Sequence, residues 1–211
     1  MSRRGGMAAA LWLGLAASAA LADVTVAPLT PQPPDFRSQI ARQQARVAAL
    51  VDGLEPPPAA EGHVEVIDTT ASPLLRKSFI DGAERMPAWT GRTIRLASGG
   101  WDLPRLAERL GDPTLLECRR QACELRGPLF IEAGASLSIG PQAGAGELRL
   151  SRAHGAFIAS LGILFVRDAT VESDAATRPA DMFRPFLLVY DTGRLVLASS
   201  RLAHLGFDAP T

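Results

Sequence analysis

The segment LFIEAGASLSI, residues 129–139, decides the fold, because the same kind of phrase recurs twice further along the chain. It returns as FIASLGILFV at residues 157–166 and as LLVYDTGRLVL at residues 187–197. Each phrase joins an apolar, strand-length segment to a second segment with alternating apolar positions through a turn glycine. The three glycines lie 28 and 31 residues apart, at Gly134, Gly162 and Gly193. The chain therefore carries an internal repeat.

This repeat predicts an all-β fold of stacked coils. Short β segments that recur at this period, with no helical pattern between them, are typical of a parallel β-helix. A β-sandwich also has short strands that end in glycine turns, but it does not require one phrase to recur. We therefore predict that residues 125–211 form an incomplete parallel β-helix, whose last coil exposes apolar residues such as Leu197 and Leu202. The predicted interior column contains Leu137, Ile139, Leu164, Val166, Leu195 and Leu197.

Residues 1–22 have the pattern of a signal peptide. Arg3 and Arg4 precede an apolar run from residue 7 to residue 21, and small residues stand at Ala20 and Ala22 just before Asp23. An uncleaved membrane anchor is the alternative, but the run is shorter than the ~20 residues that a transmembrane helix needs. We therefore expect export to the periplasm and no membrane association after cleavage.

The region between the signal peptide and the repeat predicts two further parts. Residues 23–35 are rich in proline and predict an extended linker. Residues 36–124 predict a mixed α/β N-terminal cap. A helix over 36–54 has apolar residues at helical spacing, and it could pack as a cap or pair with a partner helix.

Within the predicted cap, strands are expected at 63–67 and 92–96, with Gly99 and Gly100 breaking the second one. A helical stretch is expected around 74–86. Another helix is predicted over 103–110, with Asp102 as its N-cap, Pro104 in its first turn and Gly111 at its end.

Charge and cysteine content exclude several classes of function. The chain has 22 basic and 22 acidic residues, and this balance gives no reason to expect nucleic acid or an anionic membrane as a partner. Cys118 and Cys123 could close a small disulfide loop in an oxidising compartment. Further Cys or His ligands near this pair are lacking, so we predict no metal site, and no sequence motif points to a cofactor.

Four phrases, in order, carry a family resemblance. They are LPRLAERLGDPTLLE (103–117), LRGPLFIEAGASLSI (125–139), GELRLSRAHGAFIASLGILFVRDATV (146–171) and FRPFLLVYDTGRLVLASSRLAHLGFD (183–208). Together they resemble the N-terminal part of the periplasmic mannuronan C5-epimerases of alginate-producing bacteria. The pieces FRPFLL (183–188) and HLGFD (204–208) are the most specific.

The resemblance implies a right-handed parallel β-helix that acts on poly-β-D-mannuronate and inverts carbon five of the sugar. That family carries its chemistry on an Asp-Pro-His-Asp motif in later coils, and this chain lacks the motif. Its only Asp-Pro, Asp112-Pro113, is followed by Thr. We therefore assign no catalytic residue, and expect the chain to stop at Thr211 just before the catalytic coils of its relatives.

Four residues are candidates for binding an anionic polysaccharide. Arg184 could hold a uronate carboxylate through two parallel hydrogen bonds, or it could pair with Asp181. The ring of Tyr190 could stack on a sugar, or pack against the fold. His204, with Arg201 nearby, could lie at the edge of a sugar-binding groove, or serve as a turn histidine with local hydrogen bonds.

Three functional hypotheses follow. The chain could be the N-terminal portion of an alginate C5-epimerase, inactive alone. It could be a non-catalytic polysaccharide-binding or assembly component of an alginate export complex. It could also be a β-helical structural or adhesion module without uronate specificity.

Overall fold

The computed structural model describes residues 36–52, 55–69, 82–173 and 183–206. The predicted signal peptide, the predicted linker, Asp181 and most of the helical stretch expected around 74–86 lie outside these residues. None of the helices in the described part of the chain is long and apolar enough to cross a membrane.

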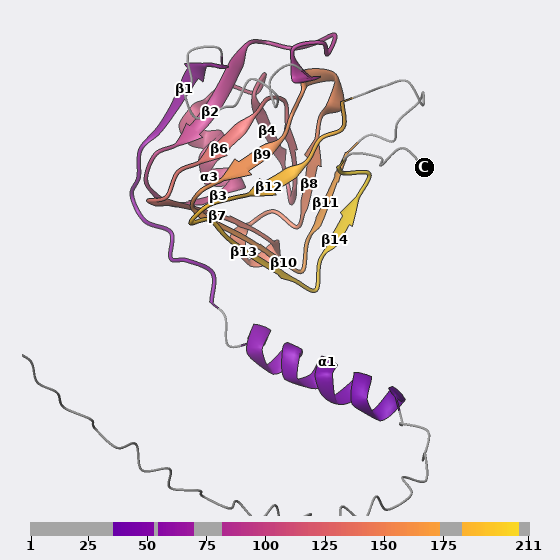
Figure 1. The fold of residues 1–211 in the computed structure, drawn as a ribbon. Helices are drawn as coiled ribbons and strands as arrows, with labels where there is room; N and C mark the ends of the chain where they lie inside the picture. Colours follow the sequence, from indigo (N-terminus) through magenta and orange to yellow (C-terminus); the bar gives the residue numbers. More distant parts are fainter. Residues whose placement is uncertain (1–35, 53–54, 70–81, 174–182, 207–211) are drawn as a thin grey trace, which may run out of the picture. The chain divides into compact units, whose positions relative to one another are not determined.

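Within the described residues, the strands lie in three sheets (Figure 1). In spatial order, the first sheet consists of β1 (Val64–Asp68), β2 (Arg92–Leu96), β6 (Leu129–Ile131), β9 (Ile158–Ser160) and β12 (Leu187–Val189). The second sheet consists of β13 (Arg194–Ala198), β10 (Ile163–Arg167), β7 (Ala135–Ile139) and β3 (Gly99–Asp102). The third sheet consists of β14 (Arg201–Ala203), β11 (Thr170–Ser173), β8 (Glu147–Leu150), β5 (Ala122–Leu125) and β4 (Leu116–Arg119).

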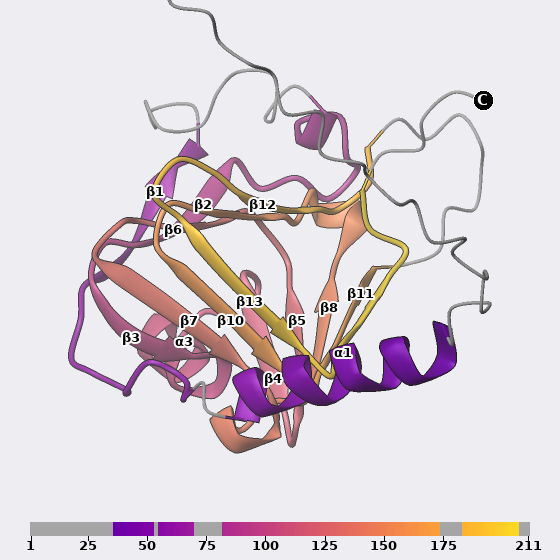
Figure 2. The same cartoon turned by 60° about the horizontal axis from the view of Figure 1, so that its bottom comes forward.

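The described strands pass through the three sheets in the same order four times, and we call each passage a round. Round one contains β2, β3 and β5, with helix α3 (Leu103–Leu110) and strand β4 inserted before β5. The later rounds are β6-β7-β8, β9-β10-β11 and β12-β13-β14. Figure 2 shows the sheets facing one another around a shared interior.

Neighbouring strands of successive rounds are parallel. Among the described strands, only the pairs β1–β2 and β4–β5 are antiparallel. This pairing confirms the parallel sheets and excludes the β-sandwich, whose sheets are antiparallel.

Residues in register on successive rounds form columns of side chains. In the second sheet, Trp101 of β3 lies opposite Leu137, Leu137 opposite Leu164, and Leu164 opposite Leu195. The first three are buried, whereas Leu195 is 45% exposed. Each round thus covers the apolar side chains of its neighbour, as the repeat predicted. Leu197 and Leu202, also in round four, are exposed as well.

The parallel stack begins earlier than the glycine repeat indicated. Strand β2 ends at Leu96, before Gly99 and Gly100 as predicted, but these two glycines also begin a further strand, β3. Ala60 forms an isolated bridge with Gly100, and a Cβ added at Gly100 would lie 2.1 Å from the carbonyl oxygen of Pro58. Glycine is required there because another backbone segment runs antiparallel beside this strand at very short range. Round one therefore lies inside the region that the sequence predicted to be a cap.

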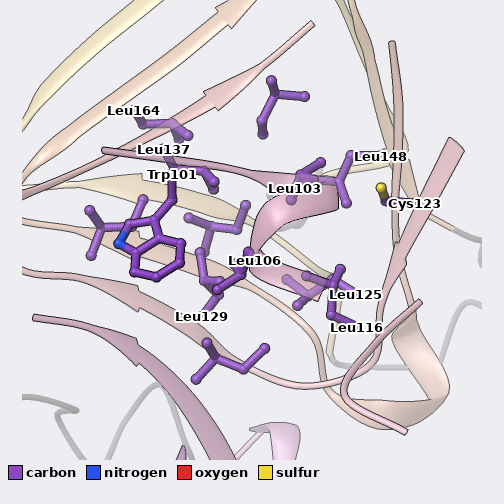
Figure 3. Close-up of a cluster of buried hydrophobic side chains, with 14 of the residues drawn as sticks. Trp101, Leu103, Leu106, Leu116, Cys123, Leu125, Leu129, Leu137, Leu148 and Leu164 are labelled. Carbon is purple, nitrogen blue, oxygen red and sulfur yellow. The ribbon is translucent and has the colours of Figure 1, made fainter. Parts of the chain in front are cut away.

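Helix α3 begins and ends as its sequence predicted. The Asp102 carboxylate accepts a hydrogen bond of 2.8 Å from the backbone N–H of Arg105, and Gly111 has a left-handed φ of 59°. These caps satisfy backbone groups that lack partners within the helix. Leu103 and Leu106 point into the main core, where they join Trp101 and the leucines of the three sheets (Figure 3).

A second apolar cluster lies on the outer face of the first sheet. Phe130, Ala159 and Leu188 are in register on β6, β9 and β12. They pack with aromatic and aliphatic side chains from the segments before β9, before β12 and around residues 83–89. The rings of Phe157 and Phe186 are stacked, with centroids 4.7 Å apart. The first sheet is therefore covered on both faces, which explains its nearly continuous apolar strands.

The two remaining features are a disulfide and a helix. Cys118 and Cys123 are joined across the β4–β5 hairpin at the edge of the third sheet. Helix α1 (Phe36–Asp52) forms within the 36–54 stretch whose pattern predicted it.

Candidate functional site

A groove of about 610 Å³ lies on the outer face of the third sheet. Its charged lining residues come from the β4–β5 hairpin and from β8, β11 and β14: Glu117, Arg119, Glu124, Arg126, Glu147, Arg149, Glu172 and Arg201. The intervening residues Cys123, Leu148 and Val171 are buried in the core. Alternation along each strand therefore sends apolar side chains inward and charged side chains into the groove.

Strand pairing arranges six polar residues of the groove in two rows. One row contains Glu147, Thr170 and Arg201, and the other contains Glu124, Arg149 and Glu172. Successive positions in a row are separated by one strand spacing, ~4.8 Å. The groove thus presents a regular ladder of polar groups along the stack.

At the hairpin end of the groove, acidic and basic side chains neutralise one another. Arg126 lies 2.8 Å from a carboxylate oxygen of Glu117 and 2.7 Å from one of Glu124. Hydrogen bonding to Glu124 raises the pKa of Arg126, and hydrogen bonding to Arg119 and then Arg126 lowers the pKa of Glu117. These residues hold the hairpin in shape.

Arg201 stands at the other end of the groove, in β14. Its side chain is exposed, and no hydrogen bond or ion pair ties it to the residues that the structure describes. A guanidinium in this situation can form two parallel hydrogen bonds to a carboxylate. Arg201 is therefore the groove cation most available to an anionic ligand.

The corner between the third and first sheets gathers further cationic residues. Arg152 belongs to the short 3₁₀ turn Arg152–His154 between β8 and β9, and its side chain is buried. Burial lowers the pKa of Arg152, and the positive charge of nearby Arg184 lowers it further. Two guanidiniums from successive rounds thus face the same region.

His154 lies in the same corner and is held by a local hydrogen bond. Its Nδ1 lies 2.7 Å from the hydroxyl oxygen of Ser151. Burial lowers the pKa of His154 below its usual value of 6.5, and the charge of Arg126 lowers it further, against an opposing effect of Glu124. The imidazole is therefore neutral at neutral pH and contributes a polar group, not a charge.

Comparison with known proteins finds relatives over part of this chain. No family model matches the chain. The mannuronan C5-epimerase of Pseudomonas aeruginosa is 32% identical over 146 residues, which is 63% of this chain and 26% of that protein. The epimerase of Pseudomonas syringae pv. tomato is 27% identical over 145 residues, and AlgG of Azotobacter vinelandii is 28% identical over 145 residues.

Over this stretch, the chain is a homologue of the mannuronan C5-epimerases. It spans about a quarter of the length of these curated epimerases. The crystal structure of the periplasmic alginate epimerase AlgG superposes with a TM-score of 0.58 at 19% identity, over 76% of this chain and 40% of that chain. A double mutant of that epimerase gives a TM-score of 0.59. The likeness to the AlgG structures extends to the fold alone.

The four candidate residues of this epimerase homologue lie in four different places. Arg201 lines the groove. Arg184 is half-buried at the corner, and His204 is exposed at the end of β14 with a left-handed φ of 57°. The backbone N–H of Gly206 donates a hydrogen bond of 2.9 Å to the carbonyl of Pro185, which ties the end of β14 to the segment containing Arg184.

Tyr190 lies elsewhere, on the outer face of the first sheet. Its ring centroid is 6.4 Å from that of Phe130, and the side chain is half-buried in the second apolar cluster. Of the two roles that the sequence left open for Tyr190, packing against the fold is the one that this position supports.

The Asp112-Pro113 pair has a structural role in this epimerase homologue. The Asp112 carboxylate accepts hydrogen bonds from Thr114 and lies 2.7 Å from a guanidinium nitrogen of Arg92. These interactions lower its pKa, with the Thr114 hydroxyl the largest cause. The carboxylate therefore stabilises the turn before β4.

Sequence reasoning missed Arg126, Arg149 and Arg152. A usable signal was the motif ELRLSR at 147–152, where charged residues alternate with leucines that face the core. The sequence alone could not show which charges from other rounds lie beside them.

Proposed function

We propose that this chain is the N-terminal portion of a poly(β-D-mannuronate) C5-epimerase of alginate biosynthesis, and that it binds this anionic polysaccharide. The homology to mannuronan C5-epimerases supports the family. The stacked parallel rounds and the likeness to AlgG support a right-handed parallel β-helix. The periplasmic AlgG structure and the signal-like N-terminal sequence support export to the periplasm.

The observation that carries the binding proposal is the exposed Arg201 in a groove whose polar side chains repeat from round to round. Arg201 lies in round four, and two further arginines, Arg152 and Arg184, come from the corners that follow rounds two and three. A polyuronate presents one carboxylate per sugar along an extended chain. Stacked rounds ~4.8 Å apart can address several of these carboxylates along one line.

The proposed role of this portion is binding, because its sequence lacks the Asp-Pro-His-Asp motif on which the family resemblance places the epimerase chemistry. Inverting carbon five requires neutralisation of the substrate carboxylate, a base on one face of the sugar and an acid on the other. In the groove, the carboxylates of Glu117 and Glu124 are committed to Arg126. We expect the chain alone to bind polymannuronate without converting it to guluronate.

A non-catalytic polysaccharide-binding component of an alginate export complex is the second candidate. The regular ladder of polar groups in the groove favours this candidate, because such a ladder suits an extended polymer. Both candidates predict polymer binding. They differ in whether epimerase activity appears when the chain is combined with the catalytic coils of a related epimerase.

The experiment measures binding of the whole chain to mannuronate oligomers by calorimetry, with neutral dextran oligomers as the comparison. Arg201→Gln should weaken mannuronate binding about fivefold, the effect of losing ~1 kcal/mol at an exposed site. Arg194→Gln is the matched control, because Arg194 is exposed in the same round but belongs to the second sheet. If Arg201→Gln and Arg194→Gln bind mannuronate equally well, the groove is not the binding site. If the chain does not bind mannuronate at all, the proposed function is wrong.

A further inference from the structure

A second pocket, of about 540 Å³, lies beside helix α3. Its lining residues come from α3, from the start of the strand segment before it and from the segment that precedes β1: Glu61, Gly62, Trp101, Arg105, Glu108 and Arg109. All of them belong to one compact unit of the chain, residues 46–211. The pocket shares no lining residue with the groove on the third sheet, so it is a distinct candidate site.

Arg105 is held in this pocket by neutral groups. Its Nη1 donates hydrogen bonds of 3.2 Å to the carbonyl oxygens of Ala60 and Gly100. Its guanidinium carbon lies 5.2 Å from the ring centroid of Trp101, within the range of a cation–π interaction. Among the described residues Arg105 forms no ion pair, and no hydrogen bond uses its Nε or Nη2 groups. Arg105 is therefore a positioned, half-buried cation with donors left for a ligand.

Arg109 lies one helical turn after Arg105, on the same side of α3. Side chains four residues apart on a helix are neighbours, and two positive charges at this spacing repel one another. Arg109 is exposed, and within the part of the chain that the structure describes it has no hydrogen bond or ion pair. An anion bound by both guanidiniums would remove the repulsion, and a carboxylate is the planar acceptor that arginine fits best.

Two carboxylates at the same pocket restrict the kind of anion. Glu61 and Glu108 are exposed, and neither has a hydrogen bond or ion pair to the described residues. They balance the two arginines, so a multiply charged anion such as phosphate meets repulsion from both. A carboxylate only accepts hydrogen bonds, and hydroxyl groups can donate to it. The charges therefore suit a ligand with one carboxylate and several hydroxyls.

We propose that this pocket binds a sugar acid. Its carboxylate lies between Arg105 and Arg109, and its hydroxyls donate hydrogen bonds to Glu61 and Glu108. The choice of a mannuronate residue as this sugar acid rests on the proposed function, because polymannuronate supplies such residues. The pocket would then give the polymer a second contact, outside the groove of the third sheet.

The experiment uses the fluorescence of Trp101, which lines the pocket. Trp12→Phe/Trp89→Phe in the whole chain leaves Trp101 as its only tryptophan, since the chain has three. Titration with monomeric D-mannuronate should give a saturable change in fluorescence. D-mannose, which lacks the carboxylate, should give none, and inorganic phosphate should bind at least about fivefold more weakly, because the two glutamates repel it.

Substitutions in this background test each side of the pocket. Arg109→Gln should weaken mannuronate binding about fivefold, the effect of losing one exposed charge pair. Arg194→Gln is the matched control, because Arg194 is an exposed arginine in the second sheet, and it should leave the affinity unchanged. Glu61→Gln/Glu108→Gln should strengthen phosphate binding and remove the preference for mannuronate.

The absence of a saturable Trp101 response to mannuronate would overturn the proposal. So would equal affinity of the parent for phosphate and mannuronate, or an Arg109→Gln variant that binds mannuronate as the parent does. Arg201→Gln tests the groove and should not change the Trp101 titration. If the pocket fails while polymer binding still depends on Arg201, only this inference is wrong. A Trp101 response to mannuronate without polymer binding would support the pocket and reject the proposed function.

Discussion

Leu195 lies in register with Leu164 on the neighbouring parallel strand, yet Leu164 is fully buried and Leu195 is 45% exposed. The two side chains occupy equivalent positions in successive rounds. What separates them is coverage: Leu164 has strands on both sides, whereas β13 is the edge strand of its sheet in the described residues. Burial in this fold is therefore supplied by the next round, not by the strand itself.

This difference in burial predicts that truncation to alanine lowers the free energy of unfolding by different amounts at the two positions. Leu164→Ala should lower the free energy of unfolding by ~2–5 kcal/mol, because it leaves a cavity between two rounds. Leu195→Ala should cost less than ~1 kcal/mol, since a half-exposed side chain loses less on truncation. Urea unfolding of both variants measures the difference. Equal costs would mean that Leu195 is covered in solution, for example by self-association.

The Cys118–Cys123 disulfide should stabilise the edge of the third sheet by a limited amount. The bond closes a short loop, with a sequence separation of 5, and the chain-entropy estimate for so short a loop is roughly 2 kcal/mol. Cys118→Ser/Cys123→Ser should lower the free energy of unfolding by about that amount. Hydrogen exchange should accelerate in β4 and β5 first. If the rate of hydrogen exchange in β4 and β5 stays unchanged, the ion pairs of the hairpin maintain its structure without the disulfide.

Asp112 predicts a loss of stability in acid. Its pKa is lowered from 3.8 by Thr114 and Arg92, so its carboxylate stabilises the folded state above that value. This contribution is lost as the pH falls through the lowered pKa, because the folded state must then take up the proton. Asp112→Asn should be less stable than the parent at pH 7, by ~1 kcal/mol, and the gap should narrow below pH ~3.

Urea unfolding at pH 7 and at low pH checks this behaviour. Asp191→Asn is the matched control, because Asp191 is an exposed turn residue with a φ of 53°, a conformation that Asn tolerates. The control should follow the parent at both pH values. A gap between Asp112→Asn and the parent that stays constant with pH would contradict a role for the charge.

Gly100 should tolerate no side chain. A Cβ there would lie 2.1 Å from the carbonyl oxygen of Pro58, so Gly100→Ala must displace the segment that pairs with Gly100 through Ala60. We expect a loss of more than ~2 kcal/mol, in the range of steric strain in a packed site. Gly134→Ala is the control, because its added Cβ would lie 3.5 Å from the nearest atom, the Ala97 carbonyl oxygen. Thermal unfolding of the two variants side by side tests the prediction, and similar melting temperatures would refute it.

Some of the fold and part of the site could be predicted from local patterns. The strand–glycine–strand phrases predicted parallel rounds, and Leu137, Ile139, Leu164 and Val166 are buried as expected. Asp102 and Gly111 predicted the ends of α3, because capping depends on residues within one turn of each end. Arg201 was predicted as a candidate and does line a groove, whereas Tyr190, another candidate, packs against Phe130.

The sequence by itself determined the local elements and the direction in which each strand faces, because alternation and turn residues act over a few positions. Only the tertiary structure decided which residues of different rounds lie opposite one another: Trp101 with Leu137, and Glu124 with Arg149. The connections between strands vary in length, and one of them contains α3. Register between rounds therefore depends on how the whole stack closes around its core, which a pattern within one strand does not contain.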